Sequence, residues 1–180
     1  MKPDWLFYVL IGLLVSERAI ELAIAHKNEK WILSRGGKEY SAGFSKIIVL
    51  FHISWFLAFA VEGTVQKAEA LAPFFFILFA FLILQGGRYW CIASLAKFWN
   101  TKVLVLPDAK LFQKGPYLWI KHPNYFVVVI EIFLYPALFG CWWTAFVGSF
   151  VNGVLLHKRI RQEEEALQRH TNYGKLFRRL

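Results

Sequence analysis

The chain has 180 residues, of which 57% are hydrophobic, and its formal net charge is +9. A soluble domain of this length would have to hide more apolar surface than its core can hold, so the composition predicts an integral membrane protein. The positive charge does not indicate a nucleic-acid partner, because no nucleic-acid-binding motif accompanies it and basic residues at a cytoplasmic membrane face meet anionic lipid headgroups.

Five long runs with few charges predict five membrane-spanning helices. In chain order these runs are Trp5–Ala25, Phe44–Val61, Leu71–Leu95, Tyr125–Gly140 and Cys141–Leu156. The last two have 16 residues each, or roughly 24 Å at ~1.5 Å per residue against a hydrocarbon core of ~30 Å. Their polar ends are therefore expected to lie slightly below the headgroups, where they line a cavity. Ser149 and Gly153 form a small-residue face that predicts helix packing.

Lys and Arg residues gather on one side of these predicted spans. Five lie between or at the edges of the first two spans, six lie from Arg88 to Lys121, and seven lie from Lys158 to Arg179, whereas the opposite side holds only Lys2 and Lys67. The positive-inside rule then places the N-terminus outside and the C-terminus in the cytoplasm. We predict one all-α membrane domain over residues 1–180, because no linker or repeat divides it.

Residues 96–121 form the longest stretch outside the predicted spans. Their alternating apolar and basic residues fit a segment that lies along the membrane surface or one that folds over a site. The stretch leads into the run His122-Pro123-Asn124-Tyr125. A proline suits the first turn of a helix, so the fourth span is expected to begin at about Asn124, with its positive dipole end toward the cytoplasm. Such an end suits a carboxylate, although a helix that simply begins at a proline is the plainer alternative.

Ionisable residues inside membrane spans are costly and point to function by default. Arg18 lies near Glu17 and Glu21 in the first span, where an ion pair that only holds helices together is an equal alternative. His52 is more simply explained as a hydrogen-bonded core histidine. Glu131 in the fourth span is a candidate for holding the substrate, or for serving as a base toward a hydroxyl acceptor. The histidines show no metal-type spacing, so no metal is predicted.

The charged segment after the fifth span contains a second candidate group. Arg159 and Glu163 are four residues apart and share a helix face. An exposed surface ion pair is the plain alternative, but the pair sits where the helix leaves the bilayer, which favours a role in a site. Glu165 with Arg169 has the favourable order for an ordinary surface pair.

Four pieces of the second half occur in a fixed order: Leu111-Phe112, Gly115-Pro116-Tyr117, His122-Pro123-Asn124-Tyr125, and Arg159 followed by Glu163-Glu164 and Leu167. With these pieces the segment from Arg88 to Leu167 resembles the core of the isoprenylcysteine carboxyl methyltransferase family, and the first half is similar to short bacterial members. The resemblance implies an enzyme that uses S-adenosylmethionine inside a membrane, with its active site facing the cytoplasm. That membrane is the plasma membrane if the source is bacterial and the endoplasmic reticulum if it is eukaryotic.

The resemblance also implies site residues. Arg159 and Glu163 would be catalytic, with Arg159 holding or orienting the acidic group of the substrate. The cofactor-binding residues it implies are Leu111, Phe112, Tyr117, His122, Pro123, Asn124, Tyr125 and Glu163. Lys121 stands where the family usually has Arg, and because the bidentate fork is then lost, no contact is assigned to it.

The expected function is O-methylation of a lipophilic acceptor, either an isoprenylcysteine carboxylate or a long-chain polyketide hydroxyl of the alkylpyrone type. The expected partners are this small-molecule or prenylated substrate and membrane lipids. Three alternatives stay open at this stage: a phospholipid N-methyltransferase, a reductase that shares similar C-terminal motifs but uses a nicotinamide cofactor, and a non-catalytic membrane protein that retains the helix hairpin.

Overall fold

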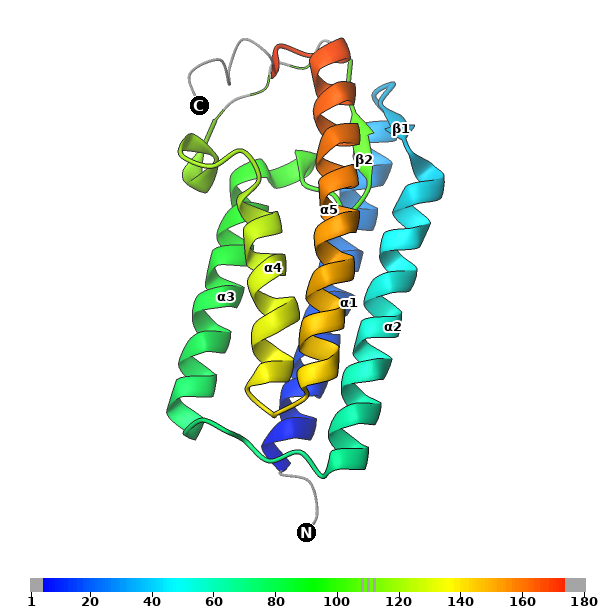
Figure 1. Cartoon of the computed structure of the whole chain (residues 1–180). Coiled ribbons are helices and arrows are strands. Elements are labelled where there is room, and N and C mark those ends of the chain that lie inside the picture. The colour runs from blue at the N-terminus through cyan, green and yellow to red at the C-terminus, as the bar shows by residue number, and fades with distance from the viewer. Residues whose placement is uncertain (1–4, 108, 110, 112, 174–180) are drawn as a thin grey trace.

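Five helices run roughly side by side and form one bundle in the computed structural model, which describes residues 5–107, 109, 111 and 113–173 (Figure 1). The helices are α1 (Trp5–Leu33), α2 (Ala42–Gln66), α3 (Phe74–Leu95), α4 (Pro123–Ala137) and α5 (Trp142–His170). This architecture confirms the prediction of an all-α protein with five long helices.

The helices differ in how well each one suits a membrane. By length and composition, α2 and the stretch Phe74–Phe98 that contains α3 are long and apolar enough to cross one, and α4 is apolar but shorter. Large apolar side chains are exposed along every helix, which is unusual for a protein surrounded by water. Examples from α1 to α5 are Val9, Leu57, Phe79, Phe126 and Phe150.

The fifth helix continues without a break beyond the predicted span to His170, as expected from the prediction that Arg159 and Glu163 share a helix face. Its first half is apolar and its second half is charged, so hydropathy marks where the apolar environment ends rather than where the helix ends. Arg159 and Glu163 therefore stand on a rigid extension of a core helix. At the other boundary, α4 begins at Pro123, within one residue of the expected start.

A short antiparallel sheet at one end of the bundle was not predicted. Strand β1 (Lys38–Tyr40) pairs with β2 (Val103–Val105), so that Lys38 lies opposite Val105 and Tyr40 opposite Val103. Both valines are buried, and they form a small cluster with Ala166 of α5. The segment after α3 is thus folded back onto the bundle.

Helix α5 packs closely against α2 at Gly148. A Cβ atom at this position would lie 2.6 Å from Cδ1 of Trp55, so only glycine permits the approach. The prediction that Gly153 serves in helix packing was wrong, because Gly153 is exposed and has open space around its Cα. The inward face of α5 instead follows the helical period through the buried residues Ala145, Gly148, Asn152, Leu156 and Arg159.

The middle of the bundle contains a cluster of buried ionic groups, which we call the ionic cluster (Arg18, Glu21, Gln85, Arg88 and Glu131). Arg88 is 1% exposed; its guanidinium pairs with Glu131, and its Nε lies 3.2 Å from Oε1 of Glu21. Nη1 of Arg18 lies 2.6 Å from Oε2 of Glu21, and Nε2 of Gln85 donates to Oε1 of Glu131 over 3.0 Å. The cluster links α1, α3 and α4, which supports a helix-holding role for the Arg18–Glu21 pair.

Candidate active site

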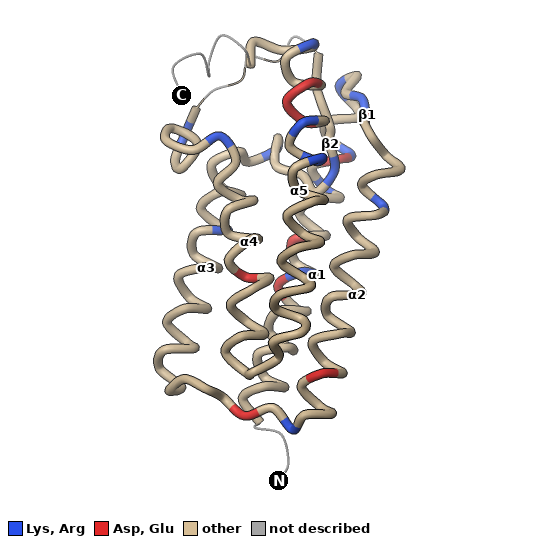
Figure 2. The backbone as a smooth tube through the Cα atoms, in the orientation of Figure 1, with Lys and Arg blue, Asp and Glu red and all other residues tan. Residues whose placement is uncertain are grey.

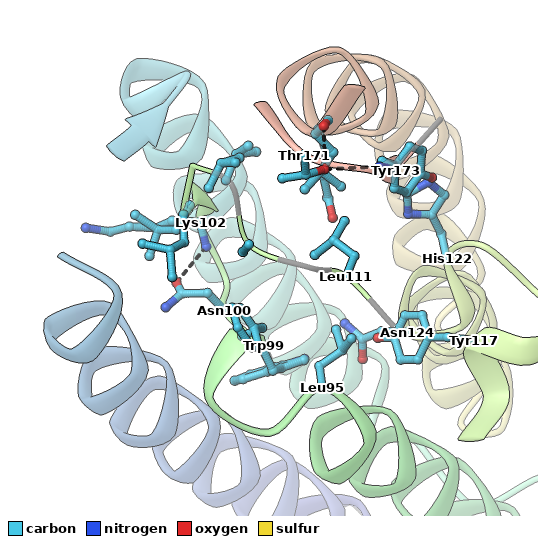
Figure 3. Close-up of a pocket in the computed structure, with 18 of the residues that line it drawn as sticks. Leu95, Trp99, Asn100, Lys102, Leu111, Tyr117, His122, Asn124, Thr171 and Tyr173 are labelled. Atoms are coloured by element: carbon cyan, nitrogen blue, oxygen red, sulfur yellow. Dashed lines mark hydrogen bonds between the residues drawn. The ribbon is translucent and has the colours of Figure 1, made fainter. Parts of the chain in front are cut away.

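A cavity opens at the end of the bundle that carries the two strands (Figure 3). Counting its open mouth, it holds about 1080 Å³ of space not filled by protein atoms. Its walls come from the end of α3, the segment that contains β2, the 3₁₀ helix η2 (Gly115–Leu118), the start of α4 and the charged half of α5. Concave sites that combine apolar and aromatic walls with a few polar groups are typical of ligand binding.

Six of the residues implied by the sequence line this cavity, although they come from four separate parts of the chain. They are Leu111, Tyr117, His122, Asn124, Tyr125 and Glu163. Pro123 is buried as the first residue of α4. Phe112 lies outside the residues that the structure describes.

Gly115 determines the path by which Tyr117 reaches the cavity. Its φ angle is +57°, and a Cβ atom there would lie 2.1 Å from Oγ of Ser94 and 2.9 Å from Nε1 of Trp90. Only glycine combines this left-handed backbone with such a close approach to α3. The turn therefore packs η2 onto α3, and this packing supports Tyr117 in the cavity wall.

Tyr125, Arg159 and Glu163 form a connected group. The hydroxyl of Tyr125 donates a hydrogen bond to the carboxylate of Glu163, and Nε of Arg159 donates to the same hydroxyl over 3.3 Å. The two remaining nitrogens of Arg159 donate to Oγ of Ser45 (3.0 Å) and to the carbonyl of Thr101 (2.8 Å). Three different segments thus fix the guanidinium in place.

The charge of Arg159 is only weakly compensated by these partners. Its side chain is 4% exposed, yet its hydrogen-bond acceptors are all neutral. Among the residues that the structure describes, its nearest carboxylate is that of Glu163, at 4.0 Å. A buried cation without a close counter-ion is costly, and an added anion relieves that cost.

His122 is held by Glu164 and Tyr125. Its Nε2 lies 3.0 Å from Oε1 of Glu164, and its ring stacks on that of Tyr125 with the ring centroids 5.4 Å apart. Glu164 therefore orients the histidine at the cavity wall.

Asn124 presents a hydrogen-bond acceptor that has no partner in the described part of the chain. Its Oδ1 is buried, and the residue lines the cavity. An unsatisfied buried acceptor costs free energy, so a donor group of a ligand bound in the cavity would be favoured at this atom.

Residues 76–169 match the family model described as the isoprenylcysteine carboxyl methyltransferase (ICMT) family. The chain belongs to this family. It is 39% identical to the uncharacterized protein YpbQ of Bacillus subtilis over 166 residues, which cover 92% of this chain and 99% of that protein. An uncharacterized protein of Haemophilus influenzae is 24% identical over 160 residues, which cover 88% and 93% of the two chains. No solved structure matches the chain significantly.

Family membership confirms the resemblance seen in the sequence and indicates a methyltransferase associated with a membrane. Glu131, the other substrate-binding candidate, does not line this cavity. It belongs to the ionic cluster, six residues along α4 from Tyr125, which corresponds to roughly 9 Å of helix.

The cavity also includes residues that the sequence did not single out as site residues. They are Trp99, Asn100, Lys102, Lys121, Thr171 and Tyr173 among others. The sequence signal for the first three was the alternation of apolar and basic residues in the segment 96–121. Of the two interpretations of that pattern, the structure supports a segment folded over a site, because these residues line the cavity. No pattern pointed to Thr171 or Tyr173.

Two side chains of the cavity wall have perturbed titration. The hydrogen bond to Glu29 raises the pKa of Lys102, whose Nζ lies 2.6 Å from Oε1 of that residue. Burial raises the pKa of Tyr117, and the nearby Cys91 and Glu163 raise it further. Lys102 therefore stays charged, and the Tyr117 phenol stays neutral, at physiological pH.

Proposed function

We propose that the protein transfers a methyl group from S-adenosylmethionine to an acidic oxygen of a lipophilic acceptor. The observation that carries this proposal is the combination of the unpartnered Asn124 acceptor and the Glu163 carboxylate in one cavity with the buried, weakly compensated Arg159 beside it.

The residues present fit the proposed cofactor. Asn124 and Glu163 offer acceptors for the hydroxyl and amino groups of a nucleoside and an amino acid. The aromatic rings of Trp99, Tyr117 and Tyr125 supply flat apolar walls for a base. The start of α4 carries the positive end of a helix dipole, which suits the carboxylate of a methionine moiety.

The chemistry asks the chain mainly for positioning. When bound, S-adenosylmethionine supplies a methyl group on a sulfonium, and an attacking oxygen takes the methyl carbon while the electrons of the broken C–S bond stay on sulfur. The side chains of the cavity hold the two reactants in line and exclude water. An ionised oxygen nucleophile needs no base, so the proposal requires no side chain of the cavity to remove a proton.

Arg159 favours an acidic oxygen over an amine as the acceptor. A carboxylate or enolate would add a closer counter-ion to the buried guanidinium than Glu163, which lies 4.0 Å away, and Arg159 would orient it. A neutral amine would offer no such compensation, and it would also release a proton on methylation. We therefore place phospholipid N-methylation second.

The distribution of charge supports a cytoplasmic site. Figure 2 shows Lys and Arg gathered at the end of the bundle that carries β1, β2 and the cavity, with few at the end where the chain begins. If all five helices cross the membrane, the positive-inside rule places this end in the cytoplasm. A soluble donor would then enter from the cytoplasm, and a greasy acceptor would come from the lipid.

The test is calorimetric titration of the detergent-purified protein with S-adenosylhomocysteine, the product of the donor. Glu163→Gln is expected to weaken binding about 10-fold or more, because charge-assisted hydrogen bonds contribute about 1.5–3 kcal/mol. Glu165→Gln on the exposed face of α5 is the matched control and should bind as the wild type does.

Acceptor identity requires a second measurement. The protein is incubated with a labelled methyl donor and lipid extracts, and the methylated products are identified by mass spectrometry. Ester or ether products support the proposal, whereas methylated amines would favour the second candidate. Saturable binding of NADPH in place of S-adenosylhomocysteine would favour a reductase, and binding of neither would contradict an enzymatic role.

A further inference from the structure

The residues that follow α5 form one side of the cavity. Figure 3 shows Thr171 and Tyr173 across the cavity from Leu95 and Trp99, with Leu111 between them. We call Thr171, Asn172 and Tyr173 the C-terminal strap. Its backbone is set by Thr171, whose N–H donates to the Leu167 carbonyl and whose Oγ1 accepts the N–H of Tyr173.

Asn172 ties the strap to the loop that carries Leu111. The backbone N–H of Leu111 donates to Oδ1 of Asn172 over 2.9 Å, and Nδ2 of Asn172 lies 3.5 Å from the carbonyl oxygen of Leu111. The side-chain amide thus pairs with the peptide group as a neighbouring strand would. Because these residues are 61 positions apart, the bonds close one side of the cavity over a long loop.

Tyr173 ties the strap to Glu164 of α5, the same residue that holds His122 just before α4. Its side chain is largely buried, at 5% exposure, and lines the cavity. Its hydroxyl donates to Oε1 of Glu164 over 3.2 Å, and the same oxygen lies 3.0 Å from Nε2 of His122. One carboxylate oxygen therefore holds both the strap and the histidine at the cavity wall.

We propose that Tyr173 is a donor-binding residue and that Asn172 is a positioning residue which acts through Leu111. This inference rests on the proposed function, because it names additional residues of the same donor site. Asn172 and Leu111 contact one another at the cavity edge, so a ligand that contacts both sides is bound more tightly when the strap is docked. By reciprocity, the ligand stabilises the docked strap by the same factor.

The strap gives the site a wall that does not belong to the membrane-embedded bundle. Donor must enter and product must leave through the cytoplasmic end, and the strap lies there. Loss of the Asn172 contact is therefore expected to weaken donor and product binding while leaving the helices, and the residues that contact the acceptor, in place. That expectation separates a positioning role from a purely structural one.

The experiment is calorimetric titration of S-adenosylhomocysteine into the full-length protein in detergent. Asn172→Ala is expected to bind about 10-fold more weakly, because it removes two hydrogen bonds of about 1 kcal/mol each, one of them long. Asn172→Asp keeps the acceptor for the Leu111 N–H and should bind within about 3-fold of the wild type. Arg169→Gln, which removes only an exposed ion pair at the same helix end, is the matched control.

Tyr173 is tested by two substitutions. Tyr173→Phe keeps the ring and loses the bond to Glu164, so a drop of about 3- to 5-fold in affinity is expected. Tyr173→Ala also removes the wall and should weaken binding further. In steady-state assays both variants should raise KM for the methyl donor with kcat little changed, as expected when binding common to ground and transition states is lost.

Hydrogen exchange provides a readout that does not depend on activity. The peptide that contains Leu111 is expected to exchange faster in Asn172→Ala than in Arg169→Gln, and to be protected by S-adenosylhomocysteine in the wild type. If the wild type binds but Asn172→Ala and Tyr173→Ala bind equally well, the strap inference is overturned and the proposed function stands. If the wild type itself binds no S-adenosylhomocysteine, both proposals fail.

Discussion

The ionic cluster and the cavity at the end of the bundle that carries β1 and β2 both have buried charged side chains, but they balance them differently. In the cluster, Arg88 is flanked by the carboxylates of Glu21 and Glu131, and Arg18 and Gln85 donate to the same two groups. At the cavity, by contrast, the buried Arg159 lies behind the lining residues Tyr125 and Glu163 and has no carboxylate closer than 4.0 Å, and Asn124 keeps an unpartnered oxygen, within the part of the chain that the structure describes.

This difference separates a structural role from a binding role. A buried ion pair whose members satisfy one another holds helices in register and leaves little for a ligand to gain. Polar groups that stay unsatisfied beside open space are costly until something binds. The rule is not absolute, since Oε1 of Gln85 in the cluster also lacks a partner among the described residues.

The largest effect is expected from breaking the ionic cluster. Arg88→Met removes the cation between two buried carboxylates, which should destabilise the protein by about 3–5 kcal/mol. Unfolding by heat or denaturant in detergent measures the loss. The double variant Arg88→Met with Glu131→Met removes both partners and should recover part of it. Unchanged stability of the single variant would contradict a structural role for the cluster.

A large effect on turnover is expected from Arg159→Lys. Lysine keeps the charge but loses the fork that reaches Ser45, Thr101 and Tyr125. Turnover should fall about 100-fold, because two or three hydrogen bonds of about 1 kcal/mol each are lost at the acceptor site. S-adenosylhomocysteine affinity should change less than about 3-fold. Arg161→Lys, on the exposed face of α5, serves as the control.

Asn124→Ala sharpens the comparison, because its effects on binding and on stability should have opposite signs. Removing the only acceptor offered by this side chain should weaken S-adenosylhomocysteine binding about 10-fold. The stability of the ligand-free protein should stay the same or rise slightly, since an unsatisfied buried group is removed. Destabilisation comparable to that of Arg88→Met would show that Asn124 is a structural residue.

The smallest effect concerns pH. Because the pKa of Tyr117 is raised in the folded protein, this residue ionises first in the unfolded chain as pH rises past the ordinary tyrosine value of about 10. The unfolded state then binds fewer protons, so stability should fall above about pH 10. Tyr117→Phe should flatten this decline between about pH 10 and 11 in thermal unfolding, and should leave stability at about pH 8 unchanged.

The sequence predicted those parts of the fold that depend on local pattern. Hydropathy located the five helices, and Pro123 located the start of α4 to within one residue. Hydropathy marked only the apolar part of α5, and the spacing of Arg159 and Glu163 predicted that the helix continues beyond it. The small-residue pattern failed at Gly153, because small size indicates packing only if the residue lies on the inner face.

The candidate site was predictable only where its residues lie in compact motifs. The run at 122–125 and the Arg159–Glu163 spacing were enough to predict most of the polar residues of the site. The wall made by Trp99, Lys102 and Tyr173 depends on long-range pairing, such as the bonds from Asn28 to the carbonyls of Trp99 and Ala96. A single chain read in order contains no signal for contacts between residues about 60 or 70 positions apart.

The pairing of β1 with β2 limits how this protein can be divided. Strand β2 lines the cavity, but its partner strand β1 precedes residue 41. Glu29 and Glu39, the two acidic residues that pair with Lys102, also precede residue 41. The segment that matches the family model begins only at residue 76. A fragment that contains only that segment would lack β1, which is half of the sheet. Studies of ligand recognition therefore require α1 and β1 on the same polypeptide.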